Sequence, residues 1–436
     1  MSVDRIFPGK KSYLLDGGMG SLLQKKGLPS GQAPEYMNIH HPEKVREAHL
    51  AYIEAGSDLI ETNTFGANPI TLQKNGLAGL TTEINQRAGE LAMEAGKSGQ
   101  VRIVGSIGPT GELLAPLGGL DQDQAEQAFT QQCQALKAAG VEVVNVETMS
   151  DLRELKAAVT AAKKCGLDVM AEVSFMANGF TLSGASPQVV AATLAGLGVM
   201  AGGINCGLGP GEIKPLIKEM ADSTGLPLIV QPNAGLPQVV EGETVYNLTA
   251  DFFAELMREL LVETRPLIAG GCCGTTPAHI KALRRILDDP ALSRANGPEE
   301  RQQTEASGVF LSGRAKGFFW NGDFTPVKFV EAKPVNAEEV LVADKITDLF
   351  GLAQTGKETQ ADIIRVNLDE WQATPADLKT FIINAQLYFA GPFSVFSTDP
   401  ELLEVFFHYY IGRPLWEKPG SLQEWDNFYI PGSVTV

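Results

Sequence analysis

The chain has 436 residues, 44% of them hydrophobic and 20% charged, which is the composition of an ordinary globular protein. A chain of this length exceeds the size at which one hydrophobic core usually stops growing, so we expect a large domain and a smaller one. The net charge of -17 argues against nucleic acid and against an anionic membrane surface as partners, because both require clustered positive charge.

The sequence also lacks the signals of export and of membrane insertion. No apolar run reaches membrane-spanning length, and residues 1–11 lack the apolar core of a signal peptide. The five cysteines are an odd number and argue against a disulfide framework, which is rare in a reducing compartment. We therefore expect a cytoplasmic protein with no membrane partner.

The first 290 residues repeat one unit, a short apolar run that ends in polar residues or glycine and is followed by an amphipathic helical stretch. Eight alternating units predict a parallel (β/α)8 TIM barrel. A doubly wound open sheet is the alternative, and it is less favoured because no glycine-rich nucleotide-binding motif follows any strand. The predicted strands are residues 13–18, 58–64, 101–108, 141–148, 167–175, 202–207, 226–235 and 266–274.

Helical spacing fills the gaps between these strands. Residues 42–55 place four residues on one face, Val45, Ala48, His49 and Tyr52, and the stretch ends at Gly56. Four further helices are predicted at residues 121–139, 151–164, 213–221 and 250–262.

Polar residues and cysteines follow the predicted strands. In a barrel all eight carboxyl ends of the strands meet at one mouth, where active sites of this fold lie. Residues far apart in the sequence therefore become neighbours there. These residues are Asp16, Glu61, Asn63, Ser106, Glu147, Cys206, Asn233, Cys272 and Cys273.

The adjacent Cys272 and Cys273 lie among glycines, and Cys206 ends the strand two places earlier. Both neighbouring side chains can reach one ion only if the backbone turns sharply, which Gly274 and the preceding glycines allow. Three thiolates would leave a tetrahedral zinc ion with one open position, which an incoming thiol can take. Simple packing of small apolar cysteines and a strained vicinal disulfide are the alternatives.

Two carboxylates at the same mouth are candidates for holding a substrate. Asp16 and Glu147 could each pair with an ammonium group or act as a general base, and capping of the next helix is the alternative. The stretch Asp16-Gly17-Gly18-Met19-Gly20 adds backbone N–H groups free of bulky neighbours, which suit a carboxylate. Together these groups would hold both ends of an amino acid.

Several short motifs follow one another along residues 10 to 290. They are Asp16-Gly17-Gly18-Met19-Gly20, Glu61-Thr62-Asn63-Thr64-Phe65-Gly66-Ala67-Asn68, Gly108-Pro109-Thr110-Gly111, Val146-Glu147-Thr148, Ile204-Asn205-Cys206-Gly207, Pro232-Asn233-Ala234-Gly235-Leu236-Pro237 and Gly270-Gly271-Cys272-Cys273-Gly274-Thr275. In wording and order these motifs resemble the homocysteine S-methyltransferases, and the stretch from Glu61 to Asn68 is most similar to the homocysteine-binding module of cobalamin-dependent methionine synthase.

The resemblance implies a methyltransferase that converts homocysteine to methionine. It implies that Zn²⁺ is held by Cys206, Cys272 and Cys273, and that the homocysteine sulfur takes the fourth place as the nucleophile, with no separate protein nucleophile. It also implies roles in substrate binding. Asp16 and Glu147 would face the ammonium group, the amides near Gly18 and Met19 would hold the carboxylate, and Asn233 would lie beside the open zinc position.

The methyl donor has to be inferred separately. The D-x-H-x-x-G motif that supplies the lower cobalt ligand in corrinoid modules does not occur in the chain, and about 100 residues after the linker are too few to enclose a pterin in a barrel. We therefore expect a separate methyl-corrinoid protein as donor. The alternatives are a small sulfonium or betaine donor, a different thiol acceptor, and a non-enzymatic zinc-containing assembly module.

The remaining chain predicts a linker and a small α/β domain. Residues 1–295 form the predicted barrel, 296–335 a polar linker and connecting segment, and 336–436 the small domain. Its segments predict helices at 337–352, 375–387 and 400–410 and strands at 362–367 and 393–397. This domain loosely resembles the opening strands of a pterin-binding barrel, and an unrelated α/β capping domain is the alternative. Trp371, Trp416, Trp425 and Tyr429 are predicted to form a contact surface, or else to pack the domain onto the barrel.

Overall fold

A computed structural model describes residues 6–7, 12–29, 31–97, 101–240, 243–290, 292, 309–320, 329–331, 361–370, 374–417 and 434–435. The chain divides into two compact units. The barrel unit comprises residues 1–182 and 199–299, and the C-terminal unit comprises residues 183–198 and 300–436. The domain boundaries predicted at residues 295 and 335 stay predictions.

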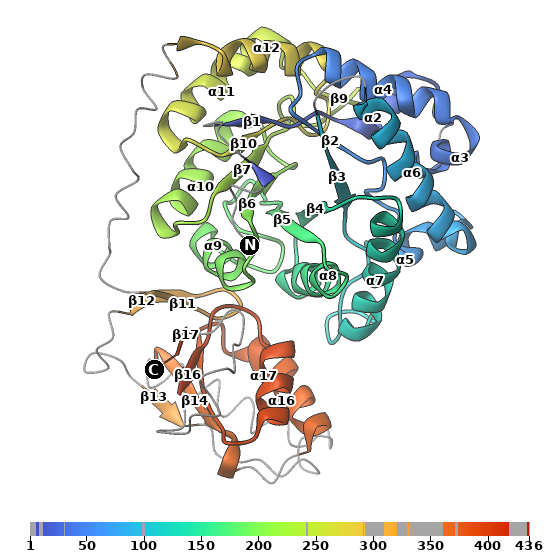
Figure 1. The fold of residues 1–436 in the computed structure, drawn as a ribbon. Coiled ribbons are helices and arrows are strands. Elements are labelled where there is room, and N and C mark those ends of the chain that lie inside the picture. The colour runs from blue at the N-terminus through green and yellow to red at the C-terminus, as the bar shows by residue number, and fades with distance from the viewer. Residues whose placement is uncertain are drawn as a thin grey trace. The chain divides into compact units, whose positions relative to one another are not determined.

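The barrel unit is built on eight parallel strands, and Figure 1 shows helices surrounding them. The strands are β1 (Tyr13–Leu14), β2 (Leu59–Glu61), β3 (Arg102–Ile107), β4 (Val143–Met149), β5 (Asp168–Val173), β6 (Ala201–Asn205), β7 (Leu228–Gln231) and β10 (Ile268–Ala269). Their order in the sheet is β1-β10-β7-β6-β5-β4-β3-β2. All eight predicted strands are present, and the predicted (β/α)8 TIM barrel is confirmed.

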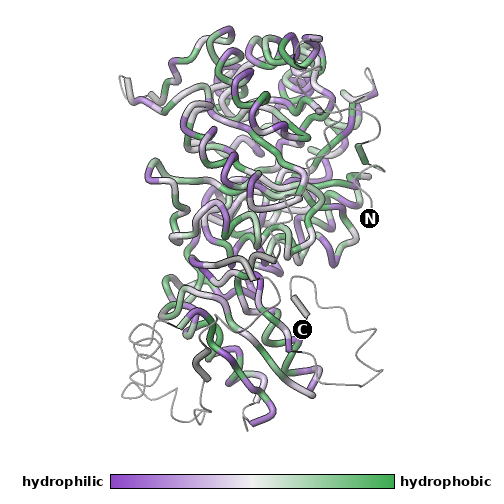
Figure 2. Tube along the Cα trace, turned by 90° about the vertical axis from the view of Figure 1, so that its left-hand side faces the viewer, coloured by the Kyte–Doolittle hydropathy of each residue, from purple (hydrophilic) through white to green (hydrophobic). Residues whose placement is uncertain are grey.

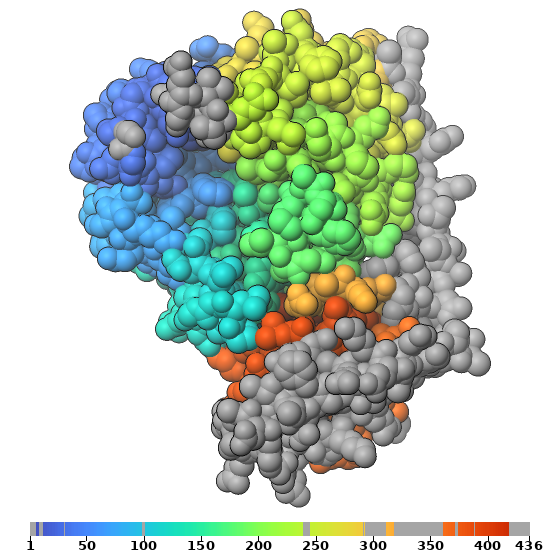
Figure 3. Space-filling model, turned by 180° about the vertical axis from the view of Figure 1, so that it is seen from behind, coloured from blue at the N-terminus to red at the C-terminus, as the bar shows by residue number. Residues whose placement is uncertain are grey.

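Hydrogen bonds between β1 and β2 join the two ends of this sheet. The Asp58 amide donates to the Leu14 carbonyl at 2.7 Å, and the Leu14 amide donates to Asp58 Oδ2 at 2.9 Å. In the space-filling view the segments follow one another around the barrel unit from blue through green to yellow (Figure 3). Residues at the ends of distant strands therefore meet at one mouth.

The helices match the predicted amphipathic stretches. In α4 the predicted face is buried, namely Val45, Ala48, His49 and Tyr52, and Gly56 ends the stretch with a φ of 100° that glycine adopts without strain. Hydrophobic and hydrophilic residues alternate along the helices, as Figure 2 shows. The helices are α2 (Met19–Lys25), α3 (Met37–His40), α4 (Pro42–Glu54), α5 (Pro69–Gln73), α6 (Thr81–Gly96), α7 (Gln122–Ala138), α8 (Leu152–Lys164), α9 (Pro187–Gly196), α10 (Pro210–Ser223), α11 (Ala250–Thr264) and α12 (Pro277–Leu287).

Seven of the eight predicted strands extend beyond the observed ones at their carboxyl ends, and β4 is the exception because it ends at Met149, one residue later than predicted. The last was predicted at residues 266–274, whereas β10 ends at Ala269. Beyond that point the Gly271 amide donates to the Asp16 carbonyl at 3.0 Å and the Cys272 amide to the Pro232 carbonyl at 2.9 Å. These bonds hold the cysteine segment beside the carboxyl ends of β1 and β7.

The half of the barrel interior nearer the amino ends of the strands is apolar. Burial of each large aliphatic side chain stabilises the fold by about 1.5–3 kcal/mol, so this half can hold the barrel together without help from the polar mouth. Its buried members include Leu15, Leu59, Val104, Met170, Ile229 and Ile268. No helix in the described part of the chain is long and apolar enough to cross a membrane.

The C-terminal unit contains a five-stranded parallel sheet whose strands follow chain order. The predicted strands and helices near residues 362, 375, 393 and 400 are present, whereas the helix predicted at residues 337–352 lies outside the described residues. The sheet strands are β13 (Phe329–Glu331), β14 (Ile363–Asn367), β15 (Phe393–Phe396), β16 (Leu415–Glu417) and β17 (Val434–Thr435), with helices α16 (Pro375–Tyr388) and α17 (Pro400–Tyr409) and an antiparallel pair, β11 (Val309–Ser312) and β12 (Gly317–Trp320).

The prediction that Trp416 forms part of an aromatic contact surface is wrong. Its side chain lies in the hydrophobic core of the C-terminal unit and is 2% exposed, because β16 is an inner strand of a parallel sheet and such strands are buried on both faces. Trp371, Trp425 and Tyr429 lie outside the described residues.

Candidate active site at the barrel mouth

Three cysteine sulfurs converge at the carboxyl ends of the strands. Cys206 follows β6, and Cys272 and Cys273 follow β10. Their sulfurs all lie within 4.8 Å of one another, and the Cys206 and Cys273 sulfurs are 3.8 Å apart. A tetrahedral ion with metal–sulfur bonds of about 2.3 Å separates its sulfur ligands by about 3.8 Å. The three side chains therefore fit one metal ion.

The backbone around the cysteines is held in an unusual conformation. Cys206 has a φ of 57°, which is uncommon for a residue other than glycine, and Gly207 follows with a φ of 71°. The Cys206 amide donates to the Gln231 carbonyl at 3.1 Å, and the Ala234 amide donates to the Cys273 carbonyl at 3.0 Å. Neighbouring strand ends thus maintain a strained turn, as is typical of functional sites.

Glu147 lies beside the thiols with both carboxylate oxygens held. Ser106 Oγ donates to Oε1 at 2.5 Å and Asn205 Nδ2 donates to Oε2 at 2.8 Å. Burial, helped by the nearby Cys273 thiolate, raises the pKa of Glu147 to about 7, against the lowering effect of the two donors. A cation placed in the mouth would favour its ionised form.

Asp16 joins the ends of β1 and β2. Its Oδ2 accepts a hydrogen bond from the Glu61 amide at 3.0 Å, and its side chain is 1% exposed. Burial raises the pKa of Asp16 well above its usual value, and Glu147 raises it further. Asp16 does not contribute to the cavity wall described next, so its position shows a structural contact between strands and leaves its role toward a substrate a proposal.

A cavity of about 400 Å³ opens among these groups. Its wall carries three glutamates, Glu35, Glu61 and Glu147, together with the three cysteines, and no lysine, arginine or histidine among the described residues. Carboxylates without basic neighbours favour a positively charged ligand. The other lining residues are Gly17, Gly18, Met19, Gly20, Ser21, Ala33, Pro34, Thr62, Asn63, Phe65, Gly66, Thr71, Asn75, Ser106, Thr148, Gln231 and Gly271.

The remaining predicted anchors have different surroundings. The Gly18 amide donates to Thr275 Oγ1 at 3.0 Å, so its hydrogen already has an acceptor. Met19 begins α2 and lines the cavity. Asn233 is 2% exposed, and its Oδ1 has no hydrogen-bond partner among the described residues.

The sequence did not indicate a polar layer beneath the mouth. Asn145 Nδ2 donates to Glu61 Oε1 at 2.9 Å and to Glu172 Oε2 at 2.7 Å, and Gln231 Nε2 donates to the same Glu172 oxygen at 2.6 Å. The available signal was a polar residue in the middle of an apolar strand, as in β4 and β5. Glu35 was also missed as a cavity residue, since it lies in a short turn before α3.

The fold and the site together define a TIM barrel that carries thiols and buried carboxyl groups at the carboxyl ends of its strands. Residues 13–287 match the homocysteine S-methyltransferase family. The match covers more than half of the chain, and the chain belongs to this family.

Individual relatives agree with this assignment. The chain is 31% identical to methionine synthase of Mycobacterium tuberculosis over 309 residues, 67% of this chain and 25% of the relative. It is 33% identical to methionine synthase of Mycobacterium leprae over 285 residues, 62% of this chain and 24% of that relative. It therefore spans about a quarter of their length. The metallated form of homocysteine methyltransferase MmuM from Escherichia coli, 24% identical, has the same fold with a TM-score of 0.55, covering 65% of this chain and 99% of that one.

Proposed function

We propose that the chain is a zinc-dependent methyltransferase that transfers a methyl group to the thiol of homocysteine and so forms methionine. The observation that carries the proposal is the convergence of three sulfurs beside buried carboxyl groups. Family membership supports homocysteine as the acceptor.

Cys206, Cys272 and Cys273 would hold the Zn²⁺ ion. When bound, the ion would lower the pKa of the substrate thiol and so supply a thiolate nucleophile at neutral pH. The separation of 3.8 Å between two of the sulfurs supports this assignment. The chain's own residues then have the task of binding the amino-acid end of the substrate and orienting its sulfur toward the cysteines.

The carboxyl groups would bind the substrate ammonium group. Glu147 lies on the cavity wall, and Asp16 lies behind Glu61 as a second source of negative charge. The Met19 amide, which has no acceptor among the described residues, is better placed than the Gly18 amide to hold the substrate carboxylate. The Asn233 oxygen, which has no hydrogen-bond partner in the described part of the chain, would serve as a polar contact beside the sulfurs.

Exposed hydrophobic residues support a protein as the methyl donor. The described residues include nine large hydrophobic side chains that are exposed, and seven of them lie in loops that follow barrel strands. Exposed apolar residues gathered around a site favour docking of a partner. We therefore propose a separate methyl-corrinoid protein as donor. We call the seven exposed residues in these loops the apolar rim; they are Phe65, Leu113, Leu117, Met176, Phe180, Leu182 and Leu236.

A small cationic donor is the second candidate. Glu35 is buried, lines the cavity and accepts a hydrogen bond from the Gly66 amide at 2.5 Å. Phe65 lies on the same wall, and a carboxylate near an aromatic ring suits a sulfonium or a quaternary ammonium group.

The test is methionine formation by the purified, zinc-loaded protein with homocysteine. The donors are a methyl-loaded corrinoid-binding fragment of a methionine synthase, free methylcobalamin, methyltetrahydrofolate, betaine and S-methylmethionine. We expect turnover with the corrinoid fragment. Turnover of roughly 1 per second or more with betaine or S-methylmethionine alone would overturn the partner, and no methionine with any donor would overturn the proposed function.

A further inference from the structure

One side chain connects two separate parts of the mouth. Asn205 ends β6, is completely buried and directly precedes Cys206. Its Nδ2 donates to Glu147 Oε2 at 2.8 Å and to Thr148 Oγ1 at 2.9 Å. Its Oδ1 accepts from the Thr148 amide at 2.8 Å. All three bonds reach the end of β4, although β5 lies between β4 and β6 in the sheet.

Both backbones joined in this way are in the left-handed region. Cys206 has a φ of 57° and Thr148 a φ of 60°. For a β-branched residue such as threonine this conformation is an outlier that needs support from its surroundings. The bond from the Thr148 amide to Asn205 supplies such support. Thr148 also follows Glu147 directly, so Asn205 contacts both the Glu147 carboxylate and the backbone next to it.

The donors on Glu147 determine which side of its carboxylate faces the cavity. An amide NH₂ group cannot accept a hydrogen bond, so the bond from Asn205 fixes Oε2 as an acceptor in one place. The Ser106 hydroxyl can rotate and either donate or accept. Asn205 is therefore the more restrictive of the two contacts, and it leaves the remaining lone pairs of Glu147 available to a cation in the cavity.

We propose that Asn205 is a positioning residue that joins the amino-acid-binding carboxylate of Glu147 to the segment that carries the ligand Cys206. It acts through Glu147 on substrate binding and through the backbone of β6 on metal binding. The inference rests on the proposed function, because it assigns Glu147 to the substrate ammonium group and Cys206 to the ion.

A double-mutant cycle tests the connection to Glu147. Homocysteine binding is measured by calorimetry for the zinc-loaded wild type, Asn205→Ala, Glu147→Gln and the double variant. We expect Asn205→Ala to weaken binding tenfold or more in the wild type and less than twofold in the Glu147→Gln background, because the carboxylate that it orients is then absent. Equal losses in both backgrounds would overturn the proposal.

Two further variants separate positioning from loss of structure. Asn205→Asp keeps the size and the acceptor for the Thr148 amide but loses the donor to Glu147, so it should fold and still weaken homocysteine binding. Asn85→Ala removes a buried amide that bonds the Ala67 and Thr81 carbonyls, and it should change homocysteine binding less than twofold. An effect of Asn85→Ala as large as that of Asn205→Ala would overturn the specific role.

Zinc affinity is the readout that needs no turnover. In competition with a chelator, Asn205→Ala should bind zinc at least fivefold more weakly than the wild type, while Glu147→Gln binds it within twofold. Unchanged zinc affinity in Asn205→Ala would overturn the connection to Cys206. If the wild type binds zinc but no homocysteine, the proposed function itself is wrong. If the wild type binds homocysteine but the losses from Asn205→Ala and Glu147→Gln are additive, only the positioning role of Asn205 is wrong.

Discussion

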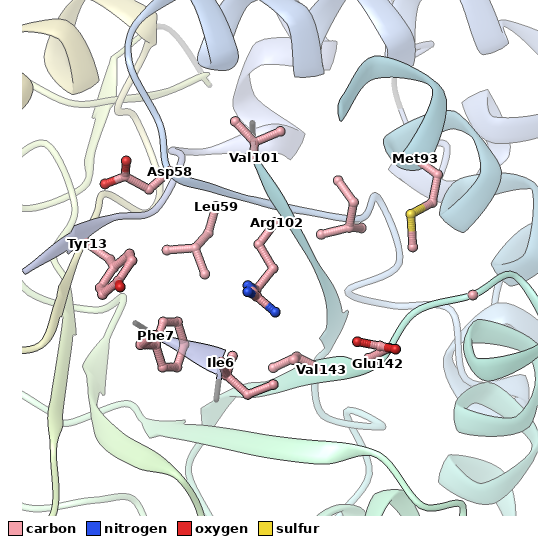
Figure 4. Close-up of a pocket in the computed structure, with 12 residues that line it drawn as sticks. Ile6, Phe7, Tyr13, Asp58, Leu59, Met93, Val101, Arg102, Glu142 and Val143 are labelled. Atoms are coloured by element: carbon pink, nitrogen blue, oxygen red, sulfur yellow. The ribbon is translucent and has the colours of Figure 1, made fainter. Parts of the chain in front are cut away.

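The barrel has a cavity at each end, and the two differ in chemistry more than in size. The cavity at the amino ends of the strands has a volume of about 520 Å³, whereas the one at the mouth has about 400 Å³. The larger cavity is lined mainly by residues at or just before the starts of β1, β2, β3 and β4, together with Ile6, Phe7 and Met93 (Figure 4). The residues near the strand starts are Tyr13, Asp58, Leu59, Val101, Arg102, Ile103, Gly140, Glu142 and Val143.

Charge compensation explains the difference between the two ends. At the amino end, Asp58 Oδ2 accepts from Arg284 Nη1 at 3.1 Å, and Arg102 extends into the centre of the group of lining residues (Figure 4). At the mouth, three glutamates and three cysteines have no basic neighbour on the cavity wall among the described residues. Acidic side chains without basic neighbours distinguish the mouth as the end suited to cations, whereas a choice by cavity volume alone would have favoured the other end.

The largest expected effect is loss of the metal. Cys272→Ala should lower zinc affinity by orders of magnitude and abolish methyl transfer, while the barrel stays folded because its apolar core is unchanged. Elemental analysis of the purified variant measures the zinc content. Cys165→Ala, which removes a cysteine at the end of α8, is the matched control and should keep one zinc per chain. Full zinc retention in Cys272→Ala would rule out the assignment.

Loss of the carboxylates should have the next largest effect. Asp16→Asn and Glu147→Gln keep the side-chain shape but remove the charge that pairs with an ammonium group, so homocysteine binding should weaken by about 1–3 kcal/mol. Titration calorimetry measures the affinity for homocysteine, and elemental analysis should show that the zinc content is unchanged. Glu142→Gln, in the cavity at the amino end, should leave the dissociation constant as it is. If all three variants bind homocysteine like the wild type, the contrast between the two ends has no functional meaning.

The apolar rim should affect the donor and not the acceptor. Phe180→Glu or Leu117→Glu would place a charge in the proposed docking surface and should raise the KM for the corrinoid fragment about tenfold, or about 1.4 kcal/mol. The rate with free methylcobalamin should stay the same. Phe252→Glu changes an equally exposed residue on α11 and serves as the control. Equal effects of rim and control variants would exclude a protein donor docked at the mouth.

The sequence predicted the positions of strands, helices and cysteines better than it predicted the contacts between side chains at the mouth. Strand and helix positions follow from the period of apolar residues, and the cysteines follow from their place at strand ends, so both could be predicted. The contacts of Asn205 with Glu147 and Thr148 could not, because they depend on strand tilt and register across an intervening strand. The same holds for Asn145 and Glu172, whose partners come from β2 and β7. The prediction that Trp416 belongs to an exposed contact surface was wrong, because the sequence did not indicate that β16 is an inner strand.

The last expected effect is on stability and not on binding, and it concerns Glu172, the buried carboxyl group beneath the mouth. Burial raises its pKa to about 8 in the folded chain, against the lowering effect of the Asn145 and Gln231 amides, whereas the unfolded chain has an ordinary glutamate pKa near 4.3. Between these two values the folded state keeps a proton that the unfolded state has released. Stability should therefore fall as the pH rises through this window, by at most about 1.4 kcal/mol per pH unit.

Glu172→Gln carries no such proton and can still accept hydrogen bonds from both amides. Its stability relative to the wild type should therefore increase from pH 5 to pH 8 and then level off, as measured by denaturant unfolding at each pH. Glu83→Gln in the exposed first turn of α6 is the control and should keep the wild-type pH dependence. If the difference between Glu172→Gln and the wild type is the same at pH 5 and pH 8, then Glu172 is already ionised in the folded chain at both pH values. The negative charge of the mouth would in that case extend into the layer beneath it, and the barrel interior would hold a full carboxylate on the two amide donors alone.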